Sequence, residues 1–254
     1  MHAFMEKTTL HSTSKPVFFN KVNIFKIIIT VFHLVGILGM TTPALRSYFQ
    51  ILTPFHLLLC TGLLFVFHQG WNRDFYLFII LSFGIGYGFE VLGVHTGFPF
   101  GNYSYGPVLG FQLFEVPLLI GVNWLLLVYL CGEIFHNRIK NDFLGAVVGA
   151  FVMVLLDVLI EPVAVKLDFW SWENEVIPLS NFIGWFGIAF IIQLIYRKLT
   201  FDKSNVLSLY LLINLAIFFL FRNRHGAAGR AYPGGQYRHF RLHAAHPERQ
   251  HAHP

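Results

Sequence analysis

Apolar segments long enough to cross a bilayer recur along this 254-residue chain. A transmembrane α-helix needs about 17–25 mostly apolar residues, because each residue adds about 1.5 Å to its length. The segments predict seven spans, over residues 23–40, 51–69, 75–93, 113–135, 143–163, 181–199 and 205–221. The predicted fold class is all-α, a polytopic transmembrane helical bundle of about seven spans. Pro54 and Pro117 are expected in the first turns of their helices and Pro162 at the end of the fifth, because proline lacks a backbone donor.

The composition argues against a water-soluble domain. Hydrophobic residues make up 55% of the chain and charged residues 12%, against about 45–50% and 25% in soluble domains. The only two cysteines, Cys60 and Cys131, lie inside apolar segments, and no CxxC or Cys/His spacing typical of zinc sites occurs. We therefore expect neither a disulfide framework nor a metal site.

Basic residues orient the predicted helices. With successive loops on alternate sides, nine basic residues share the side of the N-terminus and two lie on the other side. Cytoplasmic loops are enriched in Lys and Arg, which predicts an integral protein of the cell (inner) membrane with a cytoplasmic N-terminus. The cations form no basic face, so nucleic acid is not an expected partner. The nine are Lys7, Lys15, Lys21, Arg73, Arg138, Lys140, Arg197, Lys198 and Lys203, and the two are Arg46 and Lys166.

The helices divide the chain into three parts. We expect residues 1–22 to form a cytoplasmic N-terminal segment and residues 23–221 to form the transmembrane bundle, which would hold any catalytic site. Residues 222–254 are predicted to be a disordered tail, because they hold six arginines and six histidines but no lysine. Such an abrupt change in composition is typical of a low-complexity appendage or of a reading-frame change in the source sequence.

Acidic residues inside the spans are the strongest functional signal in the sequence. An ionisable group at a helix centre costs about 2.5–3.5 kcal/mol, so such groups must be paired, protonated or close to water. Asp157 and Glu161 are four residues apart in the fifth span and therefore share one helix face. We expect at least one of the two to hold a proton.

The predicted topology brings other polar residues to the same end of the bundle. The third span ends there with Glu90 and the fourth begins there with Glu115. The other polar and aromatic residues at this end are Thr96, Tyr103, Tyr105, Asp168, Trp170, Trp172, Asn181 and Trp185. An aromatic belt at the membrane interface would explain the Trp and Tyr residues of this list without any catalytic role.

Two further sets of residues favour structural roles. His33, His56 and His68 are isolated in apolar surroundings, where a hydrogen-bonded structural histidine is more common than a catalytic one. The glycines at positions 84, 86 and 88 alternate before Glu90 and are expected to permit close helix packing.

Five motifs follow one another between about residues 75 and 200. They read GFEVLGVHTGFPFGNYSYGPVLG, FEVPLLIGVNW, DVLIEP, FWSW and IPLSNFIGWFG. Together they resemble the CruF-like carotenoid hydratases, a family of carotenoid biosynthesis membrane proteins. The resemblance implies addition of water to the terminal C1=C2 double bond of an acyclic (ψ) carotenoid end group, as in γ-carotene or lycopene, which gives a tertiary alcohol.

The resemblance extends to individual residues. The catalytic candidates are Glu90, Glu115, Asp157 and Glu161, and the substrate-binding candidates are Thr96, Tyr103, Tyr105, Trp124, Trp172, Asn181 and Trp185. Hydration of an alkene passes through a tertiary carbocation and needs a strong proton donor. Our hypothesis assigns this role to Asp157, which Glu161 keeps protonated. Glu90 or Glu115 would position water with Asn181, Tyr103 and Tyr105, and Trp172 and Trp185 would stabilise the cation.

The partners and alternatives follow from the same chemistry. No cofactor is required. The expected partners are the carotenoid polyene, water and membrane lipid, and other carotenoid biosynthesis enzymes are a further candidate class of partner. A membrane lycopene cyclase stays open, since it begins with the same protonation but lets a neighbouring double bond trap the cation. A proton-coupled membrane transporter also stays open, because carboxylates within the membrane are common there.

Overall fold

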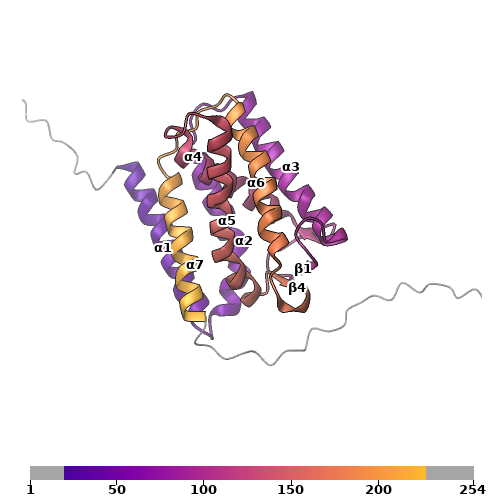
Figure 1. Ribbon diagram of the computed structural model, residues 1–254. Helices are drawn as coiled ribbons and strands as arrows, with labels where there is room; N and C mark the ends of the chain where they lie inside the picture. Colours follow the sequence, from indigo (N-terminus) through magenta and orange to yellow (C-terminus); the bar gives the residue numbers. More distant parts are fainter. Residues whose placement is uncertain (1–19, 227–254) are drawn as a thin grey trace, which may run out of the picture.

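The computed structural model describes residues 20–226, which form a bundle of seven long helices with two short β-ribbons at one end (Figure 1). The prediction of an all-α membrane bundle is confirmed. The predicted N-terminal segment up to residue 19 and the predicted tail from residue 227 lie outside the described residues. The helices are α1 Lys21–Thr41, α2 Arg46–Val66, α3 Arg73–Thr96, α4 Leu118–His136, α5 Asp142–Lys166, α6 Leu179–Lys198 and α7 Ser208–Gly226.

Six of these helices, α1 to α6, are long and apolar enough to cross a membrane. α7 is as long as α4, but its last turn carries Arg222, Asn223 and Arg224 and is therefore more polar. Large apolar side chains cover the outside of the bundle, among them Ile51, Phe55 and Ile80, each about two-thirds exposed. Such a surface suits contact with lipid and would be unfavourable in water.

α4 is the central helix of the bundle. In its most apolar stretch 67% of the residues are buried, against 22% in α2 and 28% in α1. It packs against α2, α3, α5, α6 and α7. Its neighbours α5 and α6 are joined at one end by Asp142, whose carboxylate accepts hydrogen bonds from Arg197 (3.1 Å) and Lys198 (2.7 Å). The β-ribbons lie at the opposite end (Figure 1).

The prolines differ from the prediction at two of three positions. Pro117 is the N-cap of α4, at the start of a helix as expected. α2 begins at Arg46, so Pro54 lies inside the helix instead of in its first turn, and α5 continues past Pro162 to Lys166. A proline removes one backbone hydrogen bond but does not end a membrane helix when neighbouring groups satisfy the freed carbonyl.

The start of the fourth helix was predicted too early, at residue 113. Residues 112–117 form a hairpin instead, in which β2 (Gln112–Leu113) pairs with β3 (Val116–Pro117). The two turn residues, Phe114 and Glu115, both have positive φ, 51° and 62°, as a type I′ turn requires. Helix α4 therefore begins at Leu118.

A second ribbon joins two loops that are far apart in the sequence. β1 (Tyr103–Tyr105), from the α3–α4 connection, pairs antiparallel with β4 (Trp170–Trp172), from the α5–α6 connection. The register places Tyr103 opposite Trp172 and Tyr105 opposite Trp170. Alternate residues of a strand point to the same face, so each strand presents two aromatic side chains to one side. The sequence prediction did not include this ribbon.

The glycines of α3 provide a test of this packing. A Cβ at Gly86 would collide with the Trp124 side chain of α4, whereas a Cβ at Gly84 or Gly88 would meet nothing within 4 Å. Close packing therefore accounts for Gly86 alone among the three glycines. We predict that Gly86→Ala lowers the free energy of unfolding by about 1–3 kcal/mol, as overpacking does, while the control Gly84→Ala is neutral. Thermal unfolding in detergent measures both variants, and equal Tm values would contradict this packing.

Candidate active site

Three carboxyl groups are buried together near the β1–β4 ribbon. Glu90 of α3 and Asp157 and Glu161 of α5 are 3%, 0% and 1% exposed, and they lie close enough to interact electrostatically. Within residues 20–226, the ion pairs are those of Asp142, so no Lys or Arg neutralises these three. A buried carboxylate without a cation must be hydrogen-bonded or take up a proton.

Glu90 accepts three hydrogen bonds from side chains. The Tyr103 and Tyr105 hydroxyls donate to Oε2 at 2.6 and 2.7 Å, and the Trp124 indole Nε1 donates to Oε1 at 2.9 Å. Burial and the neighbouring Glu90 raise the pKa of both phenols above their usual value. The two tyrosines are therefore neutral donors at physiological pH, and this environment suits an ionised Glu90.

Glu161 is held in a similar way by residues of β4 and α6. The indole Nε1 atoms of Trp170 and Trp172 donate to Oε2 at 3.0 and 2.8 Å, and the Asn181 amide donates to Oε1 at 3.0 Å. The two tryptophans reach the same oxygen because they are two residues apart on one strand. Glu161 thus also has three donors, as an ionised carboxylate requires.

Asp157 differs from the other two carboxyl groups. Its Oδ2 accepts one hydrogen bond, at 2.9 Å, from the same Asn181 amide that donates to Glu161. Its Oδ1 is buried and has no hydrogen-bond partner. One amide group therefore bridges two acids, and Asp157 has the fewest donors of the three.

The ribbon connects the two halves of this site. Across the strands, the Tyr103 and Trp172 rings lie 5.0 Å apart and the Tyr105 and Trp170 rings 6.0 Å apart. β1 supplies the phenols to Glu90 of α3, and β4 supplies the indoles to Glu161 of α5. Pairing of the strands therefore fixes the positions of four donors relative to two carboxylates.

An apolar cavity leads to the tryptophans of the site. A small cavity of about 70 Å³ is bounded by Trp124, Trp170 and Trp185, and by Asn123, whose buried Oδ1 has no hydrogen-bond partner. Trp185 stacks on Trp124 at 4.4 Å with an interplanar angle of 26°. Asp157 is not among the residues that line this cavity.

A larger cavity adjoins the small one. It has a volume of about 480 Å³ and lies among α1, α2 and α7. The two cavities share four lining residues, which makes them neighbours along one apolar route. The shared residues are Leu57, Phe169, Leu215 and Phe219.

The structure does not bring every predicted residue to this site. Glu115 is exposed at the tip of the β2–β3 hairpin, away from the buried carboxyls, because the residues around it form a turn and not a helix. Thr96 is exposed at the end of α3, where its hydroxyl donates to the Leu92 carbonyl (2.7 Å) and accepts from the Phe98 amide (3.1 Å). It completes the helix end and does not contact the carboxyls.

The other predicted residues do lie together, and two more join them. The three buried carboxyl groups are those of Glu90, Asp157 and Glu161. Around them lie Tyr103, Tyr105, Trp124, Trp172, Asn181 and Trp185. Trp170 and Asn123 were not among the candidates. The W-S-W spacing signals that Trp170 shares a strand face with Trp172, and Asn123 is an amide inside an otherwise apolar span.

Metal-ligating side chains gather elsewhere. Among the described residues, the one group of His, Cys, Asp or Glu side chains close enough to share an ion is His33, His56 and Cys60 on α1 and α2.

Comparisons with known proteins add to this picture. A family model described as "Carotenoid biosynthesis protein" matches residues 27–232. Bisanhydrobacterioruberin hydratase of Haloarcula japonica is 29% identical over 133 residues, which are 47% of this chain and 43% of that protein. The chain therefore matches less than half the length of this curated relative. No solved structure matches the chain at a significant level.

The shared Asn181 amide gives a prediction for the site. Replacing it by the similarly sized leucine leaves an oxygen of Asp157 and one of Glu161 without a donor, at about 1–3 kcal/mol for each unpaired group. We expect Asn181→Leu to lower the Tm in detergent clearly. In the control, Asn214→Leu, the lost bond is a local one to the Tyr210 carbonyl of the same helix, and its effect should be much smaller. A Tm for Asn181→Leu equal to that of Asn214→Leu would rule out the bridging role.

Proposed function

The chain belongs to the carotenoid biosynthesis protein family, which confirms the resemblance found in its motifs, and from this membership we propose that it is a carotenoid 1,2-hydratase. In this proposal it adds water to the terminal C1=C2 double bond of an acyclic carotenoid end group. The observation that carries the proposal is Asp157, a fully buried acid with an unpaired oxygen beside two well-paired carboxylates.

Asp157 is the best proton donor of the three acids. Glu90 and Glu161 each accept three hydrogen bonds, which stabilise their ionised forms. Asp157 accepts one, has no cation beside it, and would face Glu161 as a second negative charge if ionised. In this proposal a single proton taken up by the three acids therefore resides on Asp157, and the Oδ1 atom of Asp157 delivers it.

The reaction follows in two balanced steps. The Asp157 O–H bond breaks as the π electrons of the alkene form a C–H bond at C2, which leaves a tertiary carbocation at C1. A water oxygen then bonds to C1 and loses a proton to Glu161 or Glu90, from which the proton returns to Asp157. The net change is the gain of one water, and acid–base catalysis of this kind contributes about 10²–10⁴-fold.

The tryptophans and Asn123 have distinct roles in this proposal. Trp124, Trp170 and Trp185 line the small cavity, and in this proposal their rings stabilise the cation, by about 2 kcal/mol or more when water is excluded. Trp124 and Trp170 are tied to carboxylates by hydrogen bonds, whereas Trp185 is held by stacking. Trp185 is thus the indole that would move to bring the alkene to Asp157. The unpaired Asn123 Oδ1 would hold the attacking water.

The body of the polyene would occupy the larger cavity. Its lining is almost entirely apolar and rich in phenylalanine, and it adjoins the small cavity through four shared residues. A long, rigid hydrocarbon entering from the bilayer between α1, α2 and α7 would place only its end group near the acids.

Cyclisation and transport are weaker proposals. A cyclase must keep water from the cation, whereas here the small cavity is lined by Asn123, whose buried Oδ1 has no hydrogen-bond partner among the described residues. A proton-coupled transporter would need polar groups along a path, but the cavities are apolar and the acids gather near one end. For the orientation we propose a cytoplasmic N-terminus in the inner membrane, which would place the carboxyl site toward the outer leaflet.

Replacing the proposed donor tests the function directly. In a host that makes lycopene or γ-carotene, Asp157→Asn should reduce the hydroxylated product by at least about 10²-fold, because the amide cannot give up a proton. The control is Glu115→Gln, which changes an exposed acid outside the cluster and should leave the product unchanged. Chromatography with mass detection separates a gain of one water from the unchanged mass of a cyclised product. Full activity of Asp157→Asn at equal protein level would exclude Asp157 as the donor.

The junction of the two cavities gives a second test. Leu57 lines both cavities, whereas the next residue, Leu58, is half exposed on the outside of α2. Leu57→Trp should fill the junction and lower the yield of hydroxylated carotenoid at least tenfold, while Leu58→Trp should not. The assay is the same pigment analysis, with protein levels in the membrane compared by immunoblot. Equal yields from the two variants would show that the substrate takes another route.

A further inference from the structure

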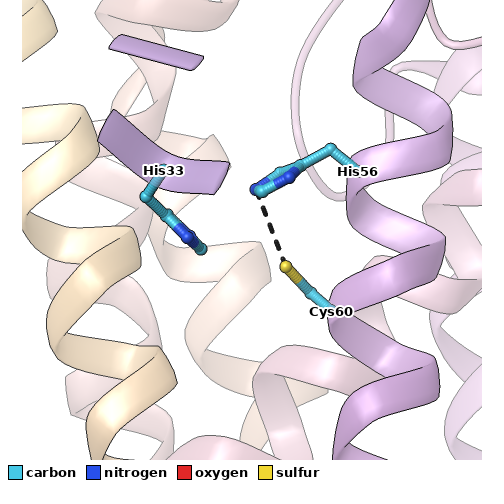
Figure 2. A group of neighbouring side chains, drawn as sticks. All are labelled: His33, His56 and Cys60. Carbon is cyan, nitrogen blue, oxygen red and sulfur yellow. Dashed lines mark hydrogen bonds between the residues drawn. The ribbon is translucent and has the colours of Figure 1, made fainter. Parts of the chain in front are cut away.

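Two histidines and a cysteine meet between α1 and α2, on helices that carry none of the three buried carboxyls. His33 comes from α1, and His56 and Cys60 come from one face of α2, four residues apart. One ligand atom of each lies within 4.8 Å of the others, and His56 Nε2 is 3.7 Å from Cys60 Sγ. Figure 2 shows the three side chains directed toward a common point between the helices.

His33 is held in the orientation of a metal ligand. Its Nδ1 lies 2.8 Å from the Ile29 carbonyl, which can only accept, so Nδ1 carries the hydrogen and Nε2 presents a lone pair. That Nε2 is buried without a partner, in a residue that is 3% exposed. Metal-bound histidines usually donate their other N–H to a carbonyl or carboxylate in this way. An unpaired acceptor in the protein interior costs about 1–3 kcal/mol, and a bound ion would satisfy it.

We propose that His33, His56 and Cys60 bind one monovalent copper ion. Two imidazoles and a thiolate form a soft ligand set that favours copper(I) or zinc over harder ions. Charge decides between these two metals. The thiolate neutralises Cu⁺ completely but would leave Zn²⁺ with one uncompensated positive charge, and none of the described residues that line the adjoining cavity is acidic. Such a charge is unfavourable in apolar surroundings.

The geometry requires little adjustment. Metal–nitrogen and metal–sulfur bonds of about 2.0–2.3 Å place the ligands of one ion about 3.5–4 Å apart. The 3.7 Å contact between His56 and Cys60 already fits, and the ligand atoms of all three side chains lie within 4.8 Å of one another. On binding, the Cys60 S–H bond is replaced by an S–Cu bond and one proton passes to the solvent, with no change of oxidation state.

Competition titration tests the site in the full-length protein. The detergent-solubilised chain is titrated with Cu⁺ under anaerobic, reducing conditions against a chromophoric copper(I) chelator. The wild type should bind one equivalent more than Cys60→Ser or His56→Gln. The comparison between variants matters because the histidines after residue 226 can bind copper in all of them. The matched control is Cys131→Ser, which alters the other buried cysteine and should keep the equivalent.

X-ray absorption provides a readout independent of stoichiometry. The copper of the wild type and of Cys131→Ser should show a sulfur neighbour that is missing in Cys60→Ser. Size-exclusion profiles check that each variant is folded. If Cys60→Ser does not fold, His56→Gln, at a half-buried position, replaces it as the ligand variant in the copper titration. Equal copper binding by the wild type and folded ligand variants would overturn the proposal. So would a site that takes Zn²⁺ but fails to compete for Cu⁺.

Discussion

The structure depends on the burial of three acids without a cation. Each buried carboxylate must be hydrogen-bonded or protonated, and six side chains from four elements, β1, α4, β4 and α6, donate to the three groups. The β1–β4 ribbon exists at the one place where loops from α3 and α5 can deliver four of those donors together. Three of the six donors are indoles, and two of these, Trp124 and Trp170, also line the small cavity. The same two residues therefore satisfy the acids and present an apolar surface.

The helices and much of the site could be predicted from the sequence. Apolar runs locate the spans, and alternation of the loops places Glu90, Asp157 and Asn181 at one end. The ribbons could not be found, because three-residue strands such as Tyr-Ser-Tyr carry little local signal and pair with a segment 67 residues away. Glu115 was misplaced for the same reason, since a hairpin of two-residue strands has the same apolar composition as a helix start.

The His33, His56 and Cys60 cluster shows a different limit of the sequence. Its only local signature is the four-residue spacing of His56 and Cys60, which occurs by chance in many helices. His33 completes the set only because α1 packs beside α2, and its free Nε2 depends on a hydrogen bond within its own helix. The expectation of no metal site rested on spacing along the chain, which does not report contacts between helices.

Packing density separates the two tasks that a membrane enzyme for a long polyene would have. α4 is largely buried and holds Trp124 against Glu90, so the most enclosed helix fixes one of the three acids. α1 and α2 are the least enclosed spans together with α3, and α1, α2 and α7 leave the larger cavity open between them. A substrate dissolved in the bilayer could enter through these helices without disturbing the hydrogen bonds of the acids. Rigid chemistry at one end and an adaptable apolar route beside it would allow one carboxyl site to serve polyenes of different length.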